Sequence, residues 1–345
     1  MASPSRLRRL SLALALLVPT AAFAGPAGIR TPADLVAYLG RITGTHTISG
    51  QYVGTADLSP IEALRAATGK SLGLISGDYY GYDQRGGTPN TAFNARAIAY
   101  WRAGGLVALN LHMSNPTTGG PVHDLSGLDA AGLLRPGTPT HSALMASLRQ
   151  VAAGLKELQA AGVVVIFRPF HENGGNWFWW GSGFKLTSDQ VVALWRTTYD
   201  YLENDQGIHN LVWLFESGQP DVDVTSNYPG DAYVDIVGQD VYMDTPGAPS
   251  VVSAYHKLVS TGKLVCMSEF GAGSPKLGNR AFDEDVLMKA FHDQMPRTVF
   301  FVQWWDANAG RVGWGMASTS NVRVALSRPW ILNRDDLPHG DPQSP

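Results

Sequence analysis

Cysteine is nearly absent from this chain, since Cys266 is the only one among its 345 residues. No intramolecular disulfide can form, so the fold must be held together by its apolar core, and a chain of this length can bury enough surface for that. Cys266 stands in an apolar run, and we expect it to be a small buried core residue. Linkers rich in Pro, Ser or Thr, internal repeats and low-complexity blocks are missing from residues 25–335, which favours a single domain.

Long apolar runs are missing as well. No stretch is long enough to span a bilayer, including the run at residues 10–18. Three arginines precede this run, and the small-x-small triplet Ala22-Phe23-Ala24 follows it, which is the pattern of a cleavable signal peptide. We therefore expect residues 1–24 to be removed and the mature protein, beginning at Gly25, to be secreted outside the cell or into a periplasm.

Basic residues are outnumbered, with 26 Lys and Arg against 29 Asp and Glu and a formal net charge of −3. Loss of the three arginines in the expected signal peptide makes the net charge −6. A mildly acidic chain argues against nucleic acid or an anionic membrane as a partner. Nothing in the sequence calls for an oligomer, and we expect a monomer.

Short apolar runs alternate with helical patterns along the whole chain. The eight runs lie at residues 47–51, 72–77, 105–112, 163–168, 209–215, 234–239, 263–268 and 298–304. The seven helical patterns lie at residues 32–42, 59–69, 91–103, 139–161, 187–204, 249–261 and 281–294. Because an open doubly wound sheet usually has fewer strands, this pattern predicts an α/β fold, a single-domain (β/α)8 TIM barrel over residues 25–335 with a polar tail at 336–345.

Local signals mark the ends of several of these helices. Ser59-Pro60, Thr187-Ser188-Asp189 and Pro249-Ser250 place a capping residue or a proline at a helix start. Gly162 and Gly262 stand just past helix ends, where a left-handed residue would terminate the helix.

The most informative stretch is residues 163–181, VVVIFRPFHENGGNWFWWG. Its apolar beginning predicts a strand buried on both faces, and His171 and Glu172 follow where that strand ends. Three tryptophans within four residues of a loop suit a sugar, whose C–H faces stack on aromatic rings. We expect Trp177 to be a sugar platform. Of Trp179 and Trp180, we expect one to pack the loop and the other to reach the cleft.

A second glutamate, Glu269, directly follows the seventh apolar run. Hydrolysis of a glycosidic bond needs two carboxyl groups, one to protonate the leaving oxygen and one to attack the anomeric carbon or to activate water. Glu172 lies in the more apolar surroundings, which suits the acid, because burial raises a carboxyl pKa. Glu269 suits the nucleophile, with Arg168 and Tyr242 placed to hydrogen-bond it and keep it ionised. Glu216 is an alternative carboxylate, but it ends the strand adjacent to that of Glu172.

The segments RPFHENGGNWFWWG and MSEFG closely resemble glycoside hydrolase family 26, the β-mannanase family of the clan A retaining glycosidases. In that clan the acid/base follows strand 4 and the nucleophile follows strand 7, which implies Glu172 and Glu269 in those roles. Most clan members have Asn before the acid/base, whereas this family has His, here His171. The resemblance implies a retaining mechanism, with carboxyl groups about 5–5.5 Å apart.

The resemblance also implies the residues around the central sugar. His171 and Trp177 would form its walls, and His112, in HMSNP, would contact the same sugar. Tyr242, in QDVY, would hydrogen-bond the nucleophile. A tryptophan after strand 8 would form the platform; we assign Trp305, with Trp304 as the alternative. The complete predicted substrate site is His112, Arg168, His171, Trp177, Asp240, Tyr242 and Trp305.

Two departures from the family pattern stand near this site. Asn173 replaces the apolar residue that usually follows the acid/base. Phe215-Glu216-Ser217 stands where the family often has a Tyr or Ser followed by Pro, which leaves the substrate contacts of that loop open. His123, after two glycines, is expected to be an ordinary loop residue.

The chemistry needs neither a metal nor an organic cofactor, and we expect none. His171-Glu172 does not begin a zinc-binding HExxH motif, because position 175 is Gly175. We predict a secreted retaining endo-β-1,4-mannanase acting on mannan, glucomannan or galactomannan. The nearest alternative is the same fold and mechanism on mixed-linkage β-glucan or β-1,3-xylan.

Two more distant alternatives come from other classes of protein. A non-catalytic carbohydrate-binding barrel would lack one of the two glutamates, and both are present. A barrel acting on phosphorylated metabolites would have a glycine-rich phosphate site after strands 7 and 8, which Gly271-Ala272-Gly273-Ser274 only partly provides. An export signal and a tryptophan-rich cleft fit a polymer better.

Overall fold

The computed structural model describes residues 25–26, 28–55, 57–81, 88–274, 277–305 and 314–338. The expected signal peptide at 1–24 and most of the expected tail lie outside these residues. Within them, Leu337 is buried, so the packed part of the chain continues past residue 335.

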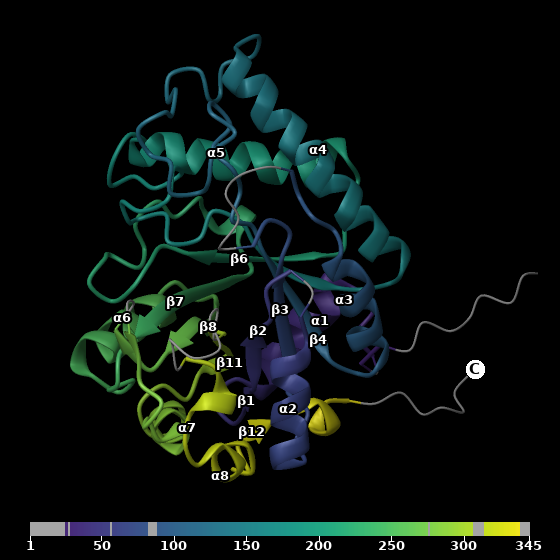
Figure 1. The fold of residues 1–345 in the computed structure, drawn as a ribbon, viewed down its shortest axis with the longest axis vertical. Coiled ribbons are helices and arrows are strands. Elements are labelled where there is room, and N and C mark those ends of the chain that lie inside the picture. The colour runs from purple at the N-terminus through teal and green to yellow at the C-terminus, as the bar shows by residue number, and fades with distance from the viewer. Residues whose placement is uncertain are drawn as a thin grey trace, which may run out of the picture.

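The central element is a closed barrel of eight parallel strands, as the sequence predicts (Figure 1). The strands are β1 (Thr47–Ile48) and β2 (Gly50–Tyr52), which together make the first, then β3 (Leu74–Asp78), β4 (Leu106–Asn110), β5 (Val165–Arg168), β6 (Leu211–Glu216), β7 (Ile236–Tyr242), β8 (Leu264–Gly271) and β11 (Thr298–Gln303). The barrel closes because β11 pairs with β8 on one side and with β1 and β2 on the other.

Helices surround these strands and agree closely with the predicted ranges. They are α1 (Pro32–Ile42), α2 (Ser59–Thr68), α3 (Phe93–Arg102), α4 (Pro139–Ala160), α5 (Ser188–Asp200) with a π-helical turn at Tyr201–Asp205, α6 (Pro249–Val259), α7 (Glu284–Asp293) and the unpredicted α8 (Val322–Leu326). In Figure 1, α4 and α5 cover the top of the barrel in the view, and α2, α7 and α8 lie below. The single-domain (β/α)8 prediction is thereby confirmed.

Helix α1 determines which end of the barrel is open. It contacts β6, β8 and β11, so it crosses the barrel end rather than flanking one pair of strands. The turn after it is tied to the start of β11, because the Gly44 N–H donates to the Pro296 carbonyl at 3.1 Å. The N-terminal ends of the strands are therefore covered, which leaves their C-terminal ends for a site.

The first strand is interrupted at Ser49, which lies between β1 and β2 and is fully buried. Its N–H donates to the Leu332 carbonyl at 2.9 Å, and its hydroxyl donates to the Asn333 side-chain oxygen at 3.1 Å. Leu332 belongs to a short outer strand, β12 (Ile331–Leu332), which pairs with β1. Ser49 thus helps to join the first strand to the C-terminal segment.

The predicted helix boundaries have the expected chemistry. Thr187 and Gln190 form a reciprocal capping box at the start of α5, and Pro249 occupies the first turn of α6. Gly162 and Gly262 have φ of +73° and +78°, the left-handed conformation predicted for them. Cys266 is buried in the core, as expected.

We expect Thr187→Ala to lower the free energy of unfolding by about 1 kcal/mol, because the mutation removes the oxygen that caps the Gln190 N–H. Thr187→Ser, which retains that oxygen, should stay close to the wild type in urea unfolding. Equal losses in the two variants would show that the methyl group, and not the cap, stabilises this helix start.

Candidate active site

A cleft of about 430 Å³ opens at the C-terminal ends of the strands. Its lining residues are His112, His123, His171, Glu172, Trp177, Phe178, Gln219, Tyr242, Glu269, Trp304 and Trp314. Both predicted catalytic glutamates are therefore on the same cleft, one from the loop after β5 and one from β8.

Glu269 is held by two hydrogen-bond donors. The Tyr242 hydroxyl donates to its Oε2 at 2.6 Å, and Arg168 Nη1 donates to its Oε1 at 2.6 Å. Both are the contacts expected from the sequence. Because each carboxylate oxygen has its own donor, the orientation of the carboxyl plane is fixed.

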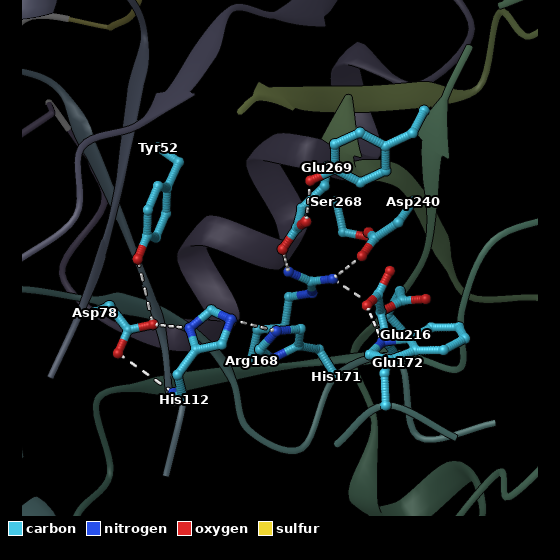
Figure 2. Close-up of polar contacts among 12 residues, drawn as sticks. Tyr52, Asp78, His112, Arg168, His171, Glu172, Glu216, Asp240, Ser268 and Glu269 are labelled. Carbon is cyan, nitrogen blue, oxygen red and sulfur yellow. Dashed lines mark hydrogen bonds and ion pairs between the residues drawn. The ribbon is translucent and has the colours of Figure 1, made fainter. Parts of the chain in front are cut away.

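Arg168 lies beneath the cleft as the centre of a buried ion cluster (Figure 2). Besides Glu269, its guanidinium contacts Glu216 at 2.8 Å and Asp240 at 2.5 Å. Asp240 also accepts from the Ser268 hydroxyl at 2.8 Å. Arg168 and Asp240 were predicted to bind substrate, but neither lines the cleft. Arg168 therefore holds Glu269 directly, and Asp240 acts on Glu269 through Arg168.

Glu172 sits on an unusual backbone. Phe170 and Glu172 have φ of +48° and +50°, a left-handed conformation that non-glycine residues rarely adopt. The Glu172 N–H donates to Glu216 Oε2 at 2.8 Å, and the Glu172 side chain accepts from Trp177 Nε1 at 2.5 Å. The two contacts place the carboxyl group over the cleft, beside an indole ring.

The surroundings shift the pKa values of both glutamates upward. Burial, and then the negative charges of Asp240, Glu269 and Glu216, raise the Glu172 pKa well above its usual value. Burial and the charge of Asp240 raise the Glu269 pKa to about 7, although Arg168 and Tyr242 act to lower it. The expected effect of those two donors is therefore present, but burial outweighs it. A raised pKa favours the protonated form, which suits Glu172 as the acid.

His112 and His171 meet in the cleft wall and are backed by Asp78 (Figure 2). His112 Nδ1 contacts the Asp78 carboxylate, and His112 Nε2 lies 3.1 Å from His171 Nε2. Burial, and then the Arg168 charge, lower the His171 pKa well below its usual value, so this imidazole is neutral.

These contacts are consistent with one pair of tautomers. In the neutral form of His112 that carries its proton on Nδ1, this proton faces Asp78 and His112 Nε2 accepts from His171 Nε2–H. His171 Nδ1 then carries a lone pair, and within the described residues it has no hydrogen-bond partner. Asp78 was not predicted as a site residue, although its place at the end of β3 was the available signal.

The three tryptophans in the loop after β5 are placed differently from the prediction. Trp177 lines the cleft, but Trp179 and Trp180 are both buried, and neither reaches it. Their indole N–H groups donate to the backbone carbonyls of Met113 and His171, at 2.7 and 2.6 Å. Both therefore fix the loop, and the ring that reaches the cleft is Phe178.

After β11 the cleft wall is Trp304 rather than the predicted Trp305. The Trp304 ring stacks on Tyr52 with centroids 4.1 Å apart and lies beside His112. Trp305 packs against Gly54 and the edge of Tyr52 instead. Consecutive residues of an extended chain point in opposite directions, so only one of the pair can face the cleft.

Four further lining residues were not predicted: His123, Phe178, Gln219 and Trp314. His123, expected to be an ordinary loop residue, stacks on Phe178 with centroids 5.2 Å apart. Its Nδ1 lies 2.9 Å from the Trp177 carbonyl oxygen. All four come from loops, where no strand pattern signals which residues converge.

Two negative findings apply to the described residues. Within them, no three His, Cys, Asp or Glu side chains are grouped so that they could hold a metal ion. None of the helices in those ranges is both long and apolar enough to cross a bilayer.

Comparison with known proteins gives a consistent result. The model of glycosyl hydrolase family 26 matches residues 25–336. The mannan endo-1,4-β-mannosidase A and B of Caldalkalibacillus mannanilyticus is 30% identical over 343 residues, covering 93% of this chain and 64% of that protein, slightly under two thirds of it. The mannan endo-1,4-β-mannosidase of Bacillus subtilis strain 168 is 28% identical, and the match covers 92% of this chain and 88% of that protein. A solved structure of a Bacillus subtilis mannanase has a TM-score of 0.80 at 26% identity, and the match covers 93% of this chain and 98% of that one.

The raised pKa of Glu269 makes stability depend on pH. The folded protein retains this proton up to about pH 7, whereas the unfolded chain releases it above about pH 4.5, so the free energy of unfolding falls between these values. Glu269→Gln cannot ionise, so its free energy of unfolding relative to that of the wild type should rise across this interval and then level off. Urea unfolding at a series of pH values tests this. A difference between the two proteins that is independent of pH would contradict it.

Asp78→Asn should reverse the tautomer of His112. Asp78 Oδ1 accepts from the N–H groups of Tyr80 and Gly81, so the oxygen of an asparagine would stay there and its NH₂ group would face His112. His112 would then have to accept at Nδ1 and carry its proton on Nε2. Long-range ¹⁵N–¹H NMR of the histidine rings distinguishes the two tautomers, and identical spectra for the wild type and the variant would refute the assignment.

Proposed function

The chain belongs to glycosyl hydrolase family 26, and on that basis we propose that it is a secreted, retaining endo-β-1,4-mannanase. Its substrates would be mannan, glucomannan or galactomannan. The observation that carries the proposal is the pairing of Glu172 and Glu269 on one aromatic-lined cleft. The relatives named as mannan endo-1,4-β-mannosidases support the substrate.

In the first step, a Glu269 oxygen attacks the anomeric carbon while Glu172 gives its proton to the glycosidic oxygen. The bond between carbon and leaving oxygen breaks as the bond to Glu269 forms, which leaves a glycosyl-enzyme ester and a free sugar hydroxyl. Arg168 and Tyr242 hold Glu269 in position for this attack.

In the second step, Glu172 is a carboxylate and acts as a base. It takes a proton from a water molecule, whose oxygen attacks the anomeric carbon and releases Glu269. Two inversions restore the original β configuration, and Glu172 regains its proton. This exchange suits a group with a high pKa, because such a group is readily protonated again.

The walls of the cleft supply recognition. Trp177 and Trp304 offer ring faces or edges for the apolar sides of a sugar, and His112 and His171 offer polar edges beside them. Rings that are already held by neighbours lose little freedom when substrate binds. Export would follow from the signal-peptide pattern at residues 1–24.

The direct test is release of reducing ends by the purified protein lacking residues 1–24, from galactomannan, glucomannan, mixed-linkage β-glucan, β-1,3-xylan and β-1,4-xylan. We expect activity on the two mannans only, with β-anomeric products at early times by ¹H NMR. Activity on a glucan or xylan instead would overturn the substrate, and α-anomeric first products would overturn the retaining mechanism.

Variants of the two glutamates separate their roles. Glu269→Ala should remove activity on all substrates. Glu172→Ala should lose most activity on mannan but retain the glycosylation step on a 2,4-dinitrophenyl β-mannoside, because that leaving group needs no acid. Azide should then raise turnover of Glu172→Ala and form a β-glycosyl azide. If azide restores activity to Glu269→Ala and gives an α-glycosyl azide, the result agrees with Glu269 as the nucleophile. A β-glycosyl azide from Glu269→Ala would instead mean that the roles of the two glutamates are reversed.

A further inference from the structure

We propose that Glu216 is the positioning residue of the acid/base Glu172, and that it acts on the Glu172 backbone rather than on its carboxyl group. The inference rests on the proposed function, which assigns the acid/base role. Glu216 ends β6, is fully buried and does not line the cleft, so it cannot touch the substrate.

Its position is defined by one oxygen that accepts two hydrogen bonds. Glu216 Oε2 lies 2.8 Å from the Glu172 backbone nitrogen and 2.8 Å from Arg168 Nη2. Its other oxygen, Oε1, has no hydrogen-bond partner within the described residues. A carboxylate suits this place, because one of its oxygens can satisfy a peptide N–H and a guanidinium together.

The Glu172 backbone needs such a partner. A left-handed φ at a non-glycine residue is strained and persists only where neighbouring groups hold it. Around it, the Gly174 N–H donates to the Ser217 carbonyl at 2.8 Å, so the loop docks along the end of β6. The Glu216 contact is the part of this docking that reaches Glu172 itself.

The same residue connects the two glutamates of the reaction. Arg168 contacts Glu216 through Nη2 and Glu269 through Nη1, so a continuous path of hydrogen bonds runs from the Glu172 backbone to the Glu269 carboxyl (Figure 2). Asp240 also contacts Arg168, but among the hydrogen bonds of the described residues it accepts none from Glu172. Glu216 therefore fixes the position of the acid/base relative to the nucleophile, on which retention depends.

Two substitutions of similar size separate the hydrogen bond from the volume of the side chain. Glu216→Gln can place its amide oxygen at the Oε2 position and its NH₂ group at the Oε1 position, so it keeps both contacts. Glu216→Met has no strong acceptor and leaves the Glu172 N–H unpaired. Arg168 retains Asp240 and Glu269 in either variant, so the nucleophile stays held.

The measurement is kcat/KM on two substrates, mannopentaose and 2,4-dinitrophenyl β-mannobioside. Mannopentaose needs acid assistance and the aryl mannobioside does not. We expect Glu216→Met to lose about tenfold to a hundredfold on mannopentaose but less than about threefold on the aryl substrate. Glu216→Gln should stay near the wild type on both. Equal losses on the two substrates, or no loss on either, would overturn the proposal.

A crystal structure of each variant provides a readout that does not depend on activity. In Glu216→Met, residue 172 should leave the left-handed region, and in Glu216→Gln it should remain there. A left-handed residue 172 in the methionine variant would overturn the proposal. If Glu216→Met does not fold, Glu216→Leu, which is smaller and also lacks an acceptor, takes its place in both experiments. A wild type inactive on both substrates would instead refute the proposed function, while the crystal structures would still decide the role of Glu216.

Discussion

The site depends on one guanidinium placed among three carboxylates at the end of the barrel. Arg168 is buried between Glu216, Asp240 and Glu269. Taking these charges out of water costs several kcal/mol per ion, and only a donor with several fixed N–H groups offsets that cost. Burial, and then the excess negative charge of the cluster, raise the pKa values of Glu172 and Glu269 above those of exposed glutamates. The buried cluster therefore orders the site and also favours protonated carboxyl groups in it.

The sequence was sufficient to predict the barrel, because buried parallel strands read as apolar runs and the helices between them carry clear start and stop signals. It also predicted both glutamates and the two donors of Glu269, since polar residues appear abruptly where the strands end. The sequence did not predict which of the strand-end residues line the cleft and which lie beneath it. Arg168 and Asp240 look like cleft residues in the sequence, yet they lie below it.

The remaining errors have a common origin in register and loops. The pairing of β7 with β8 shifts between Gln239 and Asp240, and the pairing of β8 with β11 shifts twice. Each irregularity changes which side chains face inward, so Trp304 and Trp305 cannot be assigned from alternation alone. Loop residues such as His123 and Gln219 converge only through the path of the folded chain.

Ser49 has a consequence for how the molecule is made. The first strand donates its outer hydrogen bonds to residues 330–333, almost three hundred positions later in the sequence. During synthesis, β1 is the first strand to be made, and its outer edge stays unpaired until nearly the whole chain has been translated. Exposed strand edges attract other chains. A nascent polypeptide of this kind therefore benefits from being kept unfolded until its final segments are complete.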